Sequence, residues 1–160
     1  VYMKDLNNEM DKYVGAWLYD DGNVEFEIEF QKLEHVQFYD NIYTDLLVGE
    51  YRYKDGVELI NTLPQMSNLE GFYHHIAGLR IVSFYRNCDG CSAATRRFLL
   101  HIRDPERTYI NAVIILEYIE NTNPQELKVF VQSDGMIIQP YENAPYEMRV
   151  PFGEYTLIKQ

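Results

Sequence analysis

The chain has 160 residues, 46% hydrophobic and 24% charged, so we expect one globular domain over residues 1–160. Its formal net charge is −11, and because no Lys/Arg cluster offsets it we expect neither nucleic acid nor an anionic membrane surface as a partner. No apolar run approaches the ~20 residues of a transmembrane span. Because the chain begins at Val1 and not at a methionine, we interpret it as a mature or trimmed form, and the lack of a signal peptide argues only weakly for the cytoplasm.

The N-terminal residues predict one short helix followed by strands. Leu6, Met10 and Tyr13 recur at helical spacing, so residues 4–13 predict a short amphipathic helix. Residues 24–30 alternate strictly between apolar residues and glutamates, which predicts a strand with one buried and one solvated face. Residues 64–78 form the least regular stretch, and we expect a loop there, with a lid as one interpretation.

Four Asp-Gly pairs predict tight β-hairpins, because a type I′ turn needs positive φ at both central residues. The pairs begin at Asp21, Asp55, Asp89 and Asp134. Their predicted arms are residues 14–19 with 24–31, 46–54 with 57–63, 79–87 with 97–103, and 127–133 with 136–139. Two further runs, residues 109–120 and 155–159, also look extended. Many short strands with tight turns are typical of an all-β sandwich or barrel.

Both cysteines, Cys88 and Cys91, flank the third Asp-Gly pair. A structural zinc site needs four ligands, and a thioredoxin-like redox motif needs its first cysteine at a helix N-terminus. We favour a third interpretation, a hairpin loop whose arms carry the cysteines face to face. Cross-strand Cα atoms lie about 5.5 Å apart, which a disulfide can span. The pair is therefore a disulfide candidate, and we expect no metal.

Other polar residues are also candidate sites. His74 and His75 beside Tyr73 could line a ligand mouth, but we favour a solvated loop. Residues 19–23 carry oxygen ligands without the EF-hand spacing, which favours a turn. No nucleophile motif, phosphate-binding loop or distinctive pair of carboxylates is present, so we expect no enzyme, no catalytic residue and no cofactor.

Several motifs resemble known barrels. Gly15-Ala16-Trp17 resembles the Gly-x-Trp signature of the lipocalins and wider calycins, in which the Trp closes one barrel end. An uncharacterised lipocalin-like family of exported proteins from Bacteroidetes, often lipoproteins, is similar to this chain in the motifs DLLVGEYRY, NTL, FLLHIRDP and VPFGEYTLIK. The resemblance implies an antiparallel up-and-down calycin-like barrel of about 8–10 strands, with an open sandwich as the alternative. It also implies a periplasmic or outer-membrane setting, and it makes Arg149 a loose match for the arginine that packs on the closing Trp in lipocalins.

The aromatic residues suggest two functions. They either fill a closed core, which we favour, or line a cavity, because a small eight-stranded barrel can just fill itself or hold one small ligand. Candidate ligand-binding residues are Trp17, Tyr19, Phe26, Phe30, Tyr51 and Tyr53. The first hypothesis is a non-enzymatic envelope protein that binds a small apolar or amphipathic ligand. The alternative is an envelope module for protein–protein or glycan interaction, with a filled barrel and no ligand.

Overall fold

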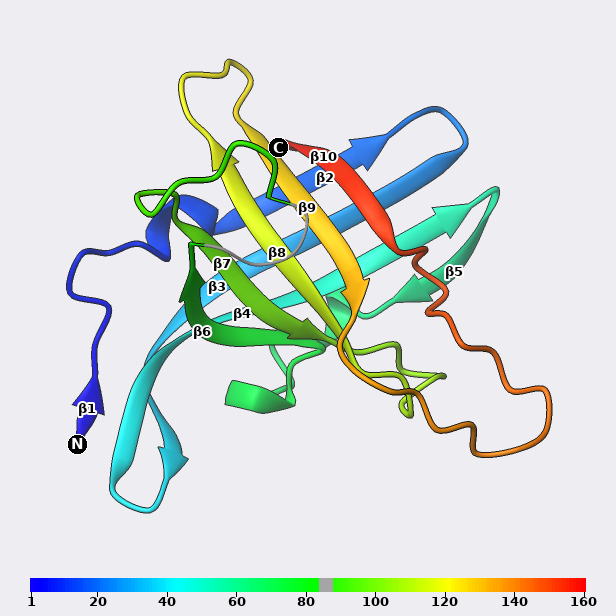
Figure 1. Cartoon of the computed structure of the whole chain (residues 1–160), viewed down its shortest axis with the longest axis horizontal. Coiled ribbons are helices and arrows are strands. Elements are labelled where there is room, and N and C mark those ends of the chain that lie inside the picture. The colour runs from blue at the N-terminus through cyan, green and yellow to red at the C-terminus, as the bar shows by residue number, and fades with distance from the viewer. Residues whose placement is uncertain (84–87) are drawn as a thin grey trace.

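Strands make up nearly all of the regular structure in the computed structural model (Figure 1), which describes residues 1–83 and 88–160. Within these ranges there are ten strands and three short 3-10 helices, labelled η. They are β1 (Tyr2–Met3), η1 (Asp11–Tyr13), β2 (Gly15–Asp20), β3 (Val24–Tyr39), β4 (Ile42–Asp55), β5 (Val57–Asn61), η2 (Leu63–Gln65), η3 (Gly71–Tyr73), β6 (Ile76–Val82), β7 (Arg97–Ile102), β8 (Ala112–Ile119), β9 (Glu126–Ser133) and β10 (Gly153–Lys159).

Eight of the strands close into an antiparallel barrel, as the sequence predicts. Around the barrel they follow in chain order as β2, β3, β4, β6, β7, β8, β9 and β10. Pairing of β10 with β2, at Ile158–Leu18 and Lys159–Trp17, joins the last strand to the first. In Figure 1, β8, β9 and β10 cross in front of β2 and β3. None of the helices in residues 1–83 and 88–160 is long and apolar enough to cross a membrane.

The alternating strand predicted at residues 24–30 is confirmed with its two faces. Phe26, Ile28 and Phe30 are buried in the main core cluster. On the other face, Glu25 and Glu27 form ion pairs with β4, where Glu27 Oε2 lies 3.1 Å from Nη2 of Arg52. Because the inward residues of all eight strands meet in the same way, the core lies inside the barrel.

The predicted N-terminal helix is wrong in all but its last three residues, which form η1. In a helix the N–H of Glu9 would donate to the carbonyl of Asp5, but here it donates to the Asp5 carboxylate at 2.9 Å. Asn8 has a φ of 53°, in the left-handed region, and Leu6 is 81% exposed. The Asp5 side chain therefore competes successfully with the helix for backbone N–H groups.

The first two predicted hairpins are confirmed as β2–β3 and β4–β5, and β6 pairs with β7 as expected of the third. Residues 84–87 of its predicted arm lie outside the described residues. The fourth hairpin is wrong, because residues 136–139 form no strand. Both edges of β9 are already occupied, since Val131 pairs with Ile114 of β8 and Gly153 of β10. Residues 134–152 instead make a long irregular connection (Figure 1).

Candidate functional site

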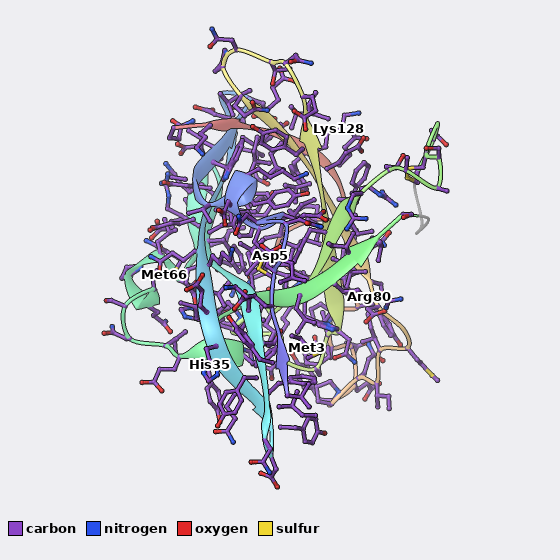
Figure 2. All side chains as sticks on the ribbon, turned by 90° about the vertical axis from the view of Figure 1, so that its left-hand side faces the viewer. Met3, Asp5, His35, Met66, Arg80 and Lys128 are labelled. Carbon is purple, nitrogen blue, oxygen red and sulfur yellow. A yellow bond between two sulfur atoms is a disulfide. The ribbon has the colours of Figure 1, made fainter. Side chains whose placement is uncertain are left out.

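The barrel wall opens between β4 and β6, and residues 3–10, here the N-terminal segment, lie over the opening. β6 pairs with β4 for only three residue pairs, and a bulge between Ala77 and Arg80 then changes its course. Gly78 permits this bulge, because a Cβ there would lie 2.6 Å from a carbonyl oxygen of β7. Figure 2 looks onto this side, with Asp5 of the N-terminal segment between β4 and β6.

A cleft of about 300 Å³, here the wall cleft, lies under the N-terminal segment. Several of its apolar residues also pack in the barrel core, so the cleft reaches the core from the side. An apolar surface with a few polar groups is the usual composition of a small-molecule site. The apolar lining residues include Met3, Met10, Leu79, Ile81 and Phe98, and the charged ones are Lys4, Asp5, Glu9, Asp45 and Arg96.

The buried carboxylate of Asp45 fastens the N-terminal segment to β4. It accepts hydrogen bonds from the Tyr2 hydroxyl, from the N–H of Asp5 at 2.9 Å and from the N–H of His35 at 3.2 Å. Burial works to raise the pKa of Asp45, but these hydrogen bonds outweigh it, so the pKa lies below its usual value. The charged form of Asp45 therefore stabilises the closed arrangement.

Asp5 is a second fastening point. Its carboxylate accepts the N–H groups of Glu9 at 2.9 Å and Met10 at 3.0 Å, and it lies 3.2 Å from Nζ of Lys32 on β3. Burial again works to raise the pKa of Asp5, and the hydrogen bonds and the ammonium group lower it overall. Across the cleft, Arg96 Nε donates to Glu9 at 2.6 Å. Ion pairs and hydrogen bonds thus hold the segment on both sides.

The six aromatic residues predicted to bind ligand lie in and around the core, and none of them lines a cavity described here. Three of them are in contact: the ring centroid of Phe26 lies 6.1 Å from that of Tyr51 and 6.1 Å from that of Tyr53. Tyr19 is only half-buried and contacts Tyr155 instead. Phe30 packs where Gly49 leaves room, since a Cβ there would lie 3.0 Å from its ring.

Trp17 is fully buried where β2 meets β10. Its Nε1 donates to the carbonyl of Tyr13 at 2.8 Å, and the ammonium group of Lys159 lies 5.2 Å from its ring centroid. The expectation that Arg149 packs on this ring is wrong. Arg149 instead pairs with the buried carboxylate of Asp104, with Nη2 and Oδ1 2.6 Å apart, which anchors the irregular connection before β10.

A disulfide joins Cys88 and Cys91, whose Cα atoms are 5.3 Å apart. The N–H of Cys91 also donates to the carbonyl of Cys88 at 3.2 Å across the Asp89-Gly90 turn. Neither cysteine lies in a described strand and residues 91–96 form no strand, so the expectation that hairpin arms carry the cysteines face to face is wrong. In the described part of the chain, no group of three His, Cys, Asp or Glu residues could hold a metal ion.

A cluster made of the buried Glu50 and His74 and the half-buried His75 is not among the sites predicted from the sequence. The solvated loop predicted there is wrong for His74, which is buried. Glu50 accepts from Nδ1 of His74 at 2.9 Å and of His75 at 2.7 Å, while His75 N–H adds a third bond. Burial works to raise the pKa of Glu50, but the His75 hydrogen bonds lower it overall. The sequence does contain one signal for this cluster. Glu50 is a carboxylate within the mostly apolar stretch of β4, where both faces of the strand are buried, so it needs buried hydrogen-bond partners.

Over residues 1–160 the chain matches a family described only as being of unknown function, DUF6705. The chain belongs to this family. Comparisons with curated proteins and with solved structures found no match. Because the description of DUF6705 names no activity, the geometry of the clefts is the basis for any functional proposal.

Proposed function

We propose that this DUF6705 member is a non-enzymatic binding protein that holds a small amphipathic molecule in the wall cleft. The observation that carries the proposal is the opening between β4 and β6, where a space of about 300 Å³ reaches core residues and is bordered by charged ones. The apolar part of a ligand would contact Leu79, Ile81 and Phe98. Its polar part would lie beside the charged residues of the N-terminal segment and Arg96.

The size of the cleft makes a useful affinity reachable. A ligand that buries about 300 Å² of apolar surface gains about 7 kcal/mol before the cost of association. Micromolar binding therefore needs only a few polar contacts in addition. The N-terminal segment would have to move for a ligand to enter fully. That movement would break the contacts of the segment with Asp45, Lys32 and Arg96, and it would leave the pairing of the eight barrel strands in place.

We also propose an exported, bacterial envelope setting, periplasmic or lipid-anchored, with a lipocalin-like barrel. The Cys88–Cys91 disulfide supports this, since disulfides persist in oxidising compartments. The Gly15-Ala16-Trp17 motif and the likeness to exported Bacteroidetes proteins support it further. These arguments concern location and ancestry, and they are independent of the ligand.

The alternative is an interaction module with a filled barrel and no ligand. It is favoured by the six aromatic candidates, five of which are buried in the core and none of which lines a described cavity. The two functions differ in one respect that can be measured, because only the first requires the wall cleft to accept a molecule.

Native mass spectrometry with a panel of fatty acids and sterols tests the proposal. We expect a one-to-one adduct with the unmodified protein. Leu79→Trp fills the cleft and should abolish the adduct, whereas Leu59→Trp, on exposed β5, is the matched control and should retain it. No adduct with any panel member, or equal binding by Leu79→Trp, would favour the interaction module.

A further inference from the structure

A second groove, here the aromatic groove, lies between the far half of β3 and η3. Its volume is about 470 Å³. It is separate from the wall cleft, because the two share no lining residue. It lies over a small cluster around Leu46 and Val48, against which Val36 and Phe72 also pack. The residues lining the groove are Val36, Gln37, Phe38, Glu70, Gly71, Phe72 and Tyr73.

Exposed rings gather at this groove. Phe38 is 44% exposed, Tyr73 75% and the neighbouring Tyr39 69%. The ring centroid of Phe38 lies 5.3 Å from that of Phe72 and 5.3 Å from that of Tyr39, so these three rings are in contact. Contiguous exposed apolar surface of this kind marks interaction sites, and aromatic residues are enriched in protein interfaces.

The charge of the groove selects the partner. Glu70 is its only charged lining residue, and no hydrogen bond or ion pair to the Glu70 side chain occurs within the described residues. The chain as a whole has a net charge of −11, which attracts cations over a distance and repels anions. Aromatic faces bind cations directly, arginine most often, through the negative potential of the ring.

We propose that the aromatic groove binds an arginine or lysine side chain presented by a basic segment of a partner protein. The cationic group would lie over the exposed ring of Phe38 and pair with Glu70. The amide of Gln37 supplies a hydrogen-bond donor and acceptor for the backbone of the bound segment. This site is independent of the wall cleft and of any ligand bound there.

The groove is held in shape before a partner arrives. Arg103 donates through Nη2 to the carbonyls of Phe72 at 3.2 Å and Tyr73 at 2.6 Å, and it does not line the groove. Directly after η3, His74 and His75 are held by the buried Glu50. Because these contacts fix η3 from within, little conformational entropy remains to be lost when a partner binds.

The experiment is an NMR titration of the whole chain with a capped peptide, acetyl-Gly-Arg-Gly-Arg-Gly-amide, at low salt. Its counterpart carries citrulline in place of arginine, which keeps the shape and removes the charge. We expect the arginine peptide to shift the amide signals of residues 36–39 and 70–73, and the citrulline peptide to bind at least severalfold more weakly. Binding should also weaken as salt is added.

Variants assign the effect to the groove. Phe38→Ala should weaken binding about two- to fivefold, the factor that corresponds to one exposed cation–π contact. Glu70→Gln should weaken it and reduce its salt dependence, while the exposed controls Tyr141→Ala and Glu142→Gln should leave it unchanged. Equal binding of the citrulline peptide, shifts spread over the acidic surface, or equal losses in the control variants would overturn the proposal. Neutral oligosaccharides are titrated in parallel. If they shift the amide signals of residues 36–39 and 70–73 and neither peptide does, the proposal is overturned in favour of glycan recognition.

Discussion

At the residue scale, Glu50 shows how one buried carboxylate organises a loop. Replacing it with alanine would leave the buried Nδ1–H of His74 and the half-buried Nδ1–H of His75 without their acceptor. We expect Glu50→Ala to lower the free energy of unfolding by about 3 kcal/mol. Glu58→Ala, on exposed β5, should change it by less than about 0.5 kcal/mol. Urea unfolding of both variants measures the difference, and a Glu50→Ala loss as small as that of the control would contradict this role.

Substitutions at Trp17 and Leu79 should have opposite effects, one on the stability of the fold and the other on ligand binding. Trp17 is fully buried but lies away from the wall cleft, so Trp17→Ala should lower the free energy of unfolding by about 3–5 kcal/mol. The fraction that remains folded should bind panel ligands with nearly unchanged affinity. Leu79→Trp should abolish ligand binding and change the free energy of unfolding little, since it fills the cleft at a half-buried position. Urea unfolding and native mass spectrometry distinguish the two, and a Trp17→Ala variant that is stable but does not bind would contradict this assignment.

At the scale of elements, acid should release the N-terminal segment before the barrel opens. Asp5 and Asp45 both have a pKa below the usual 3.8, so the stability they contribute is complete above that pH and is lost as the pH falls through their lowered values. Hydrogen exchange should therefore show falling protection at the N–H groups of Glu9 and Met10 in acid, while Ile114 in β8 stays protected. Loss of protection at all three positions together would show that the segment does not open separately.

The same elements show what could be predicted from sequence. The hairpins β2–β3 and β4–β5 follow from alternation and from Asp-Gly pairs, which act over a few residues. The all-β class also follows from these patterns, which leave a sandwich or a barrel open, whereas the closed barrel is what the resemblance to the calycins implies. The helix predicted at residues 4–13 is wrong because the Asp5 carboxylate takes the N–H groups of Glu9 and Met10, and Asp45, forty residues away, holds Asp5 itself through its N–H at 2.9 Å. The Glu50 cluster and the wall cleft join β4 to segments that lie far from it in the chain, and no local pattern encodes such pairings.

At the scale of the whole molecule, the barrel should not depend on its disulfide. Cys88 and Cys91 are separated by three positions, and closing so short a loop adds only about 2 kcal/mol in the chain-entropy model. The Cys88→Ser/Cys91→Ser double variant should therefore remain folded, with thermal unfolding still cooperative. A double variant that lacks the circular dichroism spectrum of the native protein would show that the bridge is required for folding.

The opening between β4 and β6 also bears on how such a protein could diversify. When the entrance is in the side of a barrel, the lumen need not be hollow, so selection for a solid interior and selection for a new ligand act on different residues. Under the proposed function, substitutions in the N-terminal segment would alter ligand specificity, because this segment borders the wall cleft and is not one of the eight barrel strands. We therefore expect homologues to vary most in residues 3–10 and at Arg96, while Gly78, which permits the divergence of β6, stays constant.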